Sequence, residues 1–169
     1  MYGQRKQTES GKRDRSKAGF SLIELLIVVA IILIIAAIAI PNFIKSKMLA
    51  HEAAAIQNSR NITTAEVVYS TTYGIGFSPS LVSLAGSTAT IDQNNSQLID
   101  TVLGSGTKSG YSFSYSILTQ DAQGHVTGYA LNADPLTSTT GQRHFYTDQT
   151  SVIRVNLSAS AGPSDPAIQ

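Results

Sequence analysis

The sequence contains no cysteine, and its three histidines show no spacing typical of a metal site. The lack of cysteine excludes disulfides, thiolate catalysis and cysteine metal ligands. His51, His125 and His144 lie far apart in the chain, and no neighbouring residues complete a catalytic or metal-binding set. We therefore expect no enzymatic activity, no metal and no cofactor, and stability must come from packing.

Charge is sparse and unevenly arranged. Residues 1–19 carry six basic and two acidic residues, a net charge of +4, whereas the rest of the chain carries six basic and nine acidic residues, a net charge of −3. The whole-chain value of +1 thus describes no single surface. Because the basic excess is confined to the leader, we expect no nucleic-acid partner.

An apolar run follows this basic leader. Residues 20–40 read FSLIELLIVVAIILIIAAIAI, and as a helix these 21 residues would be about 31 Å long, which matches a bilayer core. The positive-inside rule predicts a single pass with the leader in the cytoplasm and the remainder outside. Glu24 is the only charge between Lys17 and Lys45. Since a carboxylate in hydrocarbon costs about 2.5 to 3.5 kcal/mol, we expect it to have a functional partner.

The position of the small residues separates this segment from an ordinary secretory signal. Such a signal has a cleavage site of the A-x-A type after its apolar core, and none follows Ile40. Ala18 and Gly19 instead precede the run, at its junction with the leader. Cleavage there would remove the leader and keep the membrane helix.

The segment KAGFSLIELL, residues 17–26, followed by the apolar run and Pro41-Asn42, resembles the class III signal of type IV pilins and pseudopilins. The resemblance is strong over roughly residues 15–45 and general over the remainder. It implies that a prepilin peptidase removes leader residues 1–19 by cutting between Gly19 and Phe20, and that a methyltransferase then N-methylates Phe20.

The resemblance also implies an assembly role for Phe20 and Glu24. Cleavage would create an α-ammonium at Phe20, one turn from Glu24, and the helix dipole favours a negative side chain at that end. In the family, the glutamate is thought to attract the ammonium of a neighbouring subunit and so to set the axial stagger. The simpler alternative is a carboxylate that reaches the headgroups and has no partner.

Beyond the transmembrane and assembly helix of residues 20–41, the pattern predicts an amphipathic continuation over 42–73. Pro41 either ends the membrane helix or kinks it, and the resemblance implies a helix that continues with a bend. Glu52 and Glu66 fall between the apolar positions of this continuation, which lie at Ile44, Met48, Ala55, Ile62, Ala65 and Tyr69.

Residues 74–109 have the composition of a connecting loop, because Gly74 and Gly76 interrupt the helix and polar residues follow. Two short helices are predicted inside the loop. Ser78 would cap the first, over 79–84, and Ser96 would cap the second, over 97–103.

After Gly110 the apolar residues alternate with polar ones, as in a half-buried strand. Residues 110–157 are predicted to form four antiparallel strands, at 111–117, 127–133, 143–147 and 152–156, and residues 158–169 a flexible tail. The expected fold class is α+β, a long N-terminal membrane-spanning helix packed on a four-stranded antiparallel sheet, as in the pilin fold.

The resulting hypothesis is a structural subunit of a type IV pilus. The precursor would lie in the inner membrane, and its N-terminal helix would polymerise into a homo-oligomeric filament outside the cell. The implied partners are the prepilin peptidase and methyltransferase, an assembly ATPase and an inner-membrane platform. Two alternatives stay open: a pseudopilin of a periplasmic type II secretion pseudopilus, and a membrane-anchored binding module that does not polymerise.

Overall fold

The computed structural model describes residues 19–86 and 90–168. Its main element is α1 (Leu22–Tyr73), a helix of 52 residues that ends at Gly74, whose φ of 66° favours glycine. The chain divides into two compact units, one up to Ile40 and one from Pro41 onward, because most contacts between residues lie within one unit or the other. We call the second unit the head. Leader residues 1–18, to which a cleavable signal was assigned, lie outside the described residues.

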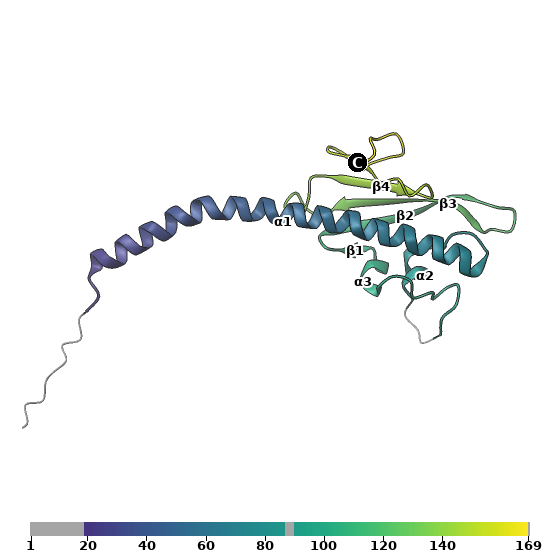
Figure 1. Ribbon diagram of the computed structural model, residues 1–169, viewed down its shortest axis with the longest axis horizontal. Helices are drawn as coiled ribbons and strands as arrows, with labels where there is room; N and C mark the ends of the chain where they lie inside the picture. The colour runs from purple at the N-terminus through teal and green to yellow at the C-terminus, as the bar shows by residue number, and fades with distance from the viewer. Residues whose placement is uncertain (1–18, 87–89, 169) are drawn as a thin grey trace, which may run out of the picture. The chain divides into compact units, whose positions relative to one another are not determined.

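The head combines the second part of α1 with two short helices and an antiparallel sheet (Figure 1). The helices are α2 (Leu81–Ala85) and α3 (Thr101–Gly104). Within the described residues the sheet has five strands in the order in which they occur along the chain: β1 (Thr107–Lys108), β2 (Tyr111–Gln120), β3 (Val126–Pro135), β4 (His144–Asp148) and β5 (Arg154–Asn156). The predicted α+β class with an antiparallel sheet is thus confirmed.

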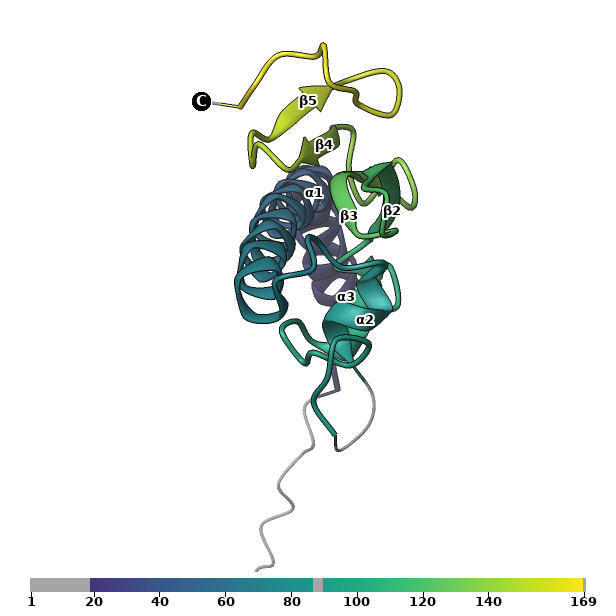
Figure 2. The same cartoon turned by 90° about the vertical axis from the view of Figure 1, so that its right-hand side faces the viewer.

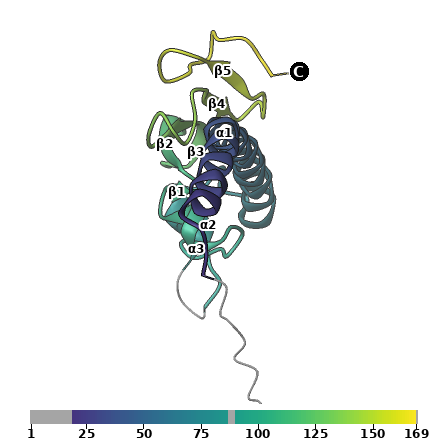
Figure 3. The ribbon, with the colours of Figure 1, turned by 90° about the vertical axis from the view of Figure 1, so that its left-hand side faces the viewer.

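The predicted strand count was one too low. The additional strand, β1, has two residues and pairs with the start of β2 through a turn at Ser109 and Gly110, where φ is 52° and 78°. A strand of this length has no alternating pattern, and its residues fell in the predicted connecting loop. Figure 2 and Figure 3 show that α2 and α3 lie on one side of the head and β5 on the other.

The core lies between α1 and one face of the sheet. On the sheet, Phe113, Ala133, Phe145 and Val155 are successive register partners and form a row across β2 to β5. The first three belong to the buried cluster that contains the stripe of α1, and Val155 is partly buried and packs against that cluster. The stripe is formed by Ala55, Ile62, Ala65 and Tyr69. These helix positions recur at intervals of three, four and seven, as predicted for an amphipathic helix.

The predicted stripe began too early. Ile44 is 44% exposed, and the fully buried positions of α1 begin only at Glu52. Two carboxylates were also placed wrongly. Glu52 and Glu66 were expected between the apolar positions and so outside the buried stripe, but they are 3% and 0% exposed. Both have specific hydrogen-bond donors, which are described below.

The two short helices exist, but with other caps. Ser80 caps α2, because the amide and hydroxyl of Ser78 both donate to the carboxylate of Glu66. Asp100 caps α3, while the hydroxyl of Ser96 donates to backbone carbonyls of α2. In each case a contact from elsewhere in the fold uses the serine that local sequence favoured as the cap.

The C-terminal segment is held against the sheet over its described part, contrary to the flexible tail predicted for 158–169. The amide of Val155 donates to the carbonyl of Pro166, and that of Ile168 donates to the carbonyl of Ile153. Ala161 is buried against Ala130 and Tyr146 on the face of the sheet that is turned away from the core row. The prolines and small residues that indicated mobility instead allow the chain to turn back.

Candidate assembly segment

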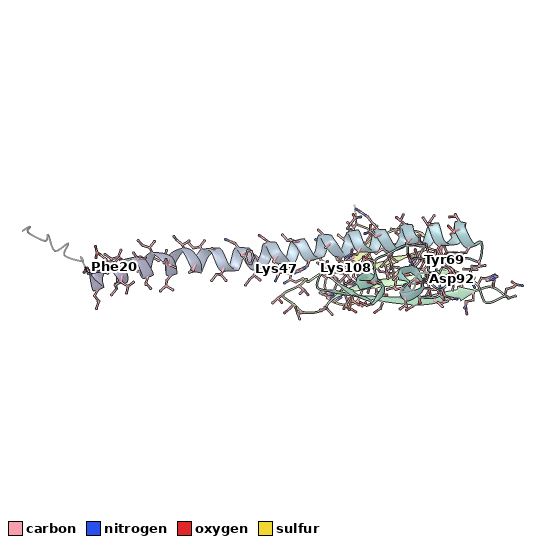
Figure 4. The ribbon with its side chains drawn as sticks, turned by 90° about the horizontal axis from the view of Figure 1, so that it is seen from below. Phe20, Lys47, Tyr69, Asp92 and Lys108 are labelled. Carbon is pink, nitrogen blue, oxygen red and sulfur yellow. The ribbon has the colours of Figure 1, made fainter. Side chains whose placement is uncertain are left out.

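The predicted processing and assembly residues meet at the start of α1. Gly19 and Phe20 lie just before the helix, separated from Leu22 by Ser21, and Phe20 is 76% exposed (Figure 4). A Cβ on Gly19 would meet no atom within 4 Å. The fold therefore does not require glycine at this position, which leaves recognition by another protein as a reason for it.

Glu24 lies in the first turn of α1. Its Oε2 accepts a hydrogen bond of 2.8 Å from the backbone N–H of Ser21, three residues earlier. This contact satisfies one of the free amides at the N-terminus of a helix, and the helix dipole favours the negative charge there. The carboxylate is thus held at the end of the helix where cleavage after Gly19 would create an ammonium.

The remaining surface of this part of α1 is apolar. Of the described helices, α1 is the one long and apolar enough to cross a membrane, and its most apolar window is 0% buried. The large side chains are about half exposed or more, as at Ile32, Ile34 and Ile38, with exposed fractions of 57%, 64% and 66%. A surface of this kind suits lipid or other apolar helices, because it has no water-compatible side.

Pro41 lies inside α1 and not at its end. The alternative in which the proline terminates the membrane helix is therefore wrong. The predicted kink remains a prediction.

Two carboxylates that sequence reasoning missed join α1 to the rest of the head. Oε1 of Glu52 accepts from the amides of Gln142 and Arg143 at 2.9 and 3.3 Å, and its Oε2 lies 2.7 Å from Nε of Arg143. Burial disfavours the charged carboxylate of Glu52, but these donors and the guanidinium outweigh burial and lower its pKa.

Glu66 has a different environment. Its Oε2 and Oε1 accept from the amide and the hydroxyl of Ser78 at 2.8 and 2.7 Å, and the hydroxyl of Tyr115 donates to the carbonyl of the same serine. Both donors to the carboxyl are neutral, so burial prevails and raises the pKa of Glu66. A sequence signal existed, since Glu52, Ser59 and Glu66 recur every seven residues and all are buried.

No group of three or more potential metal ligands occurs among residues 19–86 and 90–168. Asp134 lies in β3 and Asp148 is the last residue of β4, and each has a hydrogen-bond partner nearby. Oδ1 of Asp134 lies 2.6 Å from Nδ1 of His144, and Oδ1 of Asp148 accepts from the amide and hydroxyl of Thr150.

Comparison with known proteins supports the resemblance of the N-terminal segment to type IV pilins. Residues 14–40 match the family model of the prokaryotic N-terminal methylation motif. A stretch of 48 residues is 56% identical to the type IV major pilin protein PilA of Myxococcus xanthus (strain DK1622), covering 28% of this chain and 22% of that pilin. The match thus spans about a fifth of the relative's length. No solved structure matches the chain.

Proposed function

We propose that this chain is a structural subunit of a type IV pilus filament. The motif match and the pilin match support it as a type IV pilin-family protein. The observation that carries the proposal is the juxtaposition of Glu24, held at the first turn of α1, with an apolar helix surface whose most apolar window is 0% buried. A non-enzymatic role is consistent with the similarity to a major pilin.

In this proposal the precursor is a single-pass protein of the inner membrane with a cytoplasmic N-terminus. A prepilin peptidase cuts after Gly19, and a methyltransferase modifies the new amino group of Phe20. Lipid solvates the helix well, so hydrophobic burial gives little drive to leave the membrane, and an assembly ATPase with its inner-membrane platform must supply the work. The product is an extracellular homo-oligomeric filament.

The position of Glu24 explains how the axial offset between neighbouring subunits would be fixed. Apolar helices can slide along one another at little cost, whereas a carboxylate that must meet an ammonium fixes one axial offset. In a low-dielectric bundle such a pair attracts much more strongly than in water, and an unpaired charge is heavily penalised. The ammonium is that of Phe20 on a neighbouring subunit.

Glu24→Gln tests this step. The amide oxygen of glutamine can still accept from the N–H of Ser21, so the variant keeps the cap and removes the charge. We expect normal insertion and cleavage, with filament yield lower by about tenfold or more, because each 1.4 kcal/mol changes an equilibrium about tenfold. Electron microscopy of sheared filaments and mass spectrometry of the N-terminus measure both.

The matched control is Asp121→Asn, which removes one exposed carboxylate from a head turn while keeping its hydrogen-bond acceptor. It should leave filament yield unchanged. Normally processed Glu24→Gln protein that assembles at the control level would rule out the role of the charge.

A pseudopilin is the second candidate, and the absence of cysteine favours keeping it, because many pilins of the family carry a C-terminal disulfide loop. The two differ in outcome. Long surface fibres with a methylated Phe20 support the pilin, whereas secretion that depends on the chain without surface fibres supports the pseudopilin. An intact leader on a monomer would instead indicate the membrane-anchored binding module.

A further inference from the structure

The outer edge of β2, on the side away from β3, is only partly covered. β1 pairs with Tyr111 and Ser112, and the amide of Phe113 donates to the carbonyl of Gly106. From there to Ile117, no backbone hydrogen bond joins this edge to another part of the chain that the structure describes. The sheet therefore has a free strand edge of the kind that accepts a further strand. We call this stretch, residues 114–117, the free edge.

Alternation along the strand shows which backbone groups face outward. Phe113 turns its N–H toward β1, so Tyr115 and Ile117, two and four residues later, turn their N–H and C=O groups to the same side. Both residues are in regular register with β3, where they lie opposite Leu131 and Tyr129. The free edge thus presents two donors and two acceptors at the spacing of an antiparallel ladder.

The strand lacks the features that usually keep a free edge from pairing. Residues 111–120 read YSFSYSILTQ, with no charged residue and no proline. Natural edge strands are commonly protected by lysine, by proline or by a bulge. The register of β2 with β3 does become irregular, but only after Ile117, beyond the free groups. Ile117 is 42% exposed and Leu118 is 53% exposed, so apolar side chains accompany the free edge.

Contacts within the head hold the free edge in strand conformation. The ring of Tyr115 stacks on that of Tyr129, with the centroids 5.3 Å apart. Its hydroxyl donates to the carbonyl of Ser78 at 2.9 Å. A strand that is already ordered loses little conformational freedom when another strand pairs with it.

We propose that the free edge pairs with the free edge of a second copy of this chain, in antiparallel orientation about a two-fold axis at Ser116. In this register Tyr115 of each copy lies opposite Ile117 of the other, and all of the free donors and acceptors form hydrogen bonds. A register centred on Tyr115 would oppose Ile117 to Phe113, whose N–H is already bonded to Gly106. A register centred on Ile117 would use residues beyond the register shift.

The chemistry of the free edge favours an identical strand as its partner. Tyr115 opposite Ile117 is an aromatic and β-branched pair, a combination that stabilises neighbouring strands. Like charges directly opposite each other would oppose self-pairing, and β2 has no charge. For the same reason β2 offers no opposite charge that would select a charged peptide of another protein.

The pairing goes beyond the filament and does not rest on polymerisation. A two-fold contact is closed and turns the second copy round, whereas the contacts that repeat along a filament are head-to-tail. The pairing therefore joins two heads that are not successive subunits of one filament. Because only a few hydrogen bonds form, the contact is weak, and a covalent trap is the suitable measurement.

A disulfide trap tests the register, because the sequence contains no cysteine. At the two-fold axis the Cα atoms of the two copies of Ser116 would lie about 4.5 Å apart, within the range of a disulfide. In the same register the two copies of Ser114 would lie about 14 Å apart, too far for a disulfide. Both serines are exposed, and because they are two residues apart they lie on the same face of β2.

We expect the full-length Ser116→Cys chain in detergent to form severalfold more disulfide-linked dimer under mild oxidation than the matched control, Ser114→Cys. Non-reducing gel electrophoresis measures the dimer yield. Association through the apolar part of α1 would affect the two variants alike. Equal yields, or more dimer from Ser114→Cys, would overturn the proposal.

Removing a donor from the free edge tests the hydrogen bonds. Ile117→Pro, added to Ser116→Cys, removes an N–H that faces away from β3, and the dimer yield should fall severalfold. Circular dichroism and thermal unfolding check that this variant folds. If it does not, Ile117→Lys takes its place, because it puts like charges diagonally across the two-fold axis. An unchanged dimer yield in a folded variant would contradict the pairing.

Failure of this contact and failure of the filament proposal are separate results. Glu24→Gln, which is expected to assemble poorly, lies outside the head. Added to Ser116→Cys, it should leave the dimer yield unchanged. A dimer yield that falls with Glu24→Gln would show that the trapped contact depends on assembly through α1 and not on the free edge.

Discussion

The two halves of α1 belong to one helix but differ in what surrounds them. Up to Ile40 the helix is apolar on every side and its most apolar window is 0% buried, whereas from Glu52 onward it buries apolar residues and two carboxylates against its own sheet. Under the proposed function the first half depends on lipid and on other subunits, whereas the second half is stabilised by contacts within the chain. Changes in the first half should alter processing and assembly, and changes in the second should alter folding.

The largest expected effect is on processing. Gly19→Val should leave the leader attached in nearly all molecules, because the side chain would block the peptidase, while the free energy of unfolding of the head stays the same. Gly162→Val is the matched control, since a Cβ at either glycine meets no atom within 4 Å. The mass of the intact protein distinguishes the forms. Normal cleavage of Gly19→Val would show that the peptidase does not read this glycine.

Next in size is the contrast between two isoleucines of α1. Ile62 is 0% exposed in the core, and Ile62→Ala should lower the free energy of unfolding of the head by about 2 to 5 kcal/mol. Ile34 is 64% exposed, and Ile34→Ala should leave it unchanged. Urea unfolding of the detergent-solubilised chain measures both. Equal effects would mean that the two halves of the helix are not independent.

The two buried carboxylates should respond to pH in opposite directions. The raised pKa of Glu66 means that the unfolded chain ionises first as pH rises above about 4.5, so this residue lowers stability until the folded carboxyl also ionises. The lowered pKa of Glu52 means that its stabilisation is complete above that ordinary value and is lost as pH falls through the lowered pKa.

The corresponding variants make this measurable between about pH 3 and about pH 7. Relative to the unmodified chain, Glu66→Gln should gain stability as pH rises, and Glu52→Gln should lose it, because the latter leaves Arg143 without its charged partner. Urea unfolding at each pH gives the two slopes. Slopes of the same sign would contradict the assigned environments.

The smallest effect concerns the cap of α3. Oδ1 of Asp100 accepts from the amide of Leu103, and Oδ2 pairs with Lys108 at the surface. Asp100→Ala should lower the free energy of unfolding by about 0.5 to 2 kcal/mol through loss of the cap, whereas Asp100→Asn, which can still cap, should have much less effect. Equal losses in thermal unfolding would assign the contribution to the ion pair instead.

Much of the apolar half of α1 could be predicted from the sequence because the pattern that defines it is local. The length of the apolar run, the basic leader, Gly19 and Glu24 are properties of consecutive residues. The motif match, over residues 14–40, covers the apolar run, Gly19 and Glu24. The alternation in residues 111–115 likewise predicted β2, and the spacing of Ala55, Ile62 and Tyr69 predicted the buried stripe of α1.

The tertiary structure alone decided which polar groups of the head are buried and what they bind. Ser78 would cap a helix by local preference, but Glu66, twelve residues earlier, accepts both of its hydrogen bonds, so the cap moves to Ser80. Glu52 is buried because Arg143, ninety-one residues later, meets it. Such contacts depend on chain segments far apart in sequence, whereas the membrane span and its single carboxylate depend only on neighbouring residues and on the thickness of a bilayer.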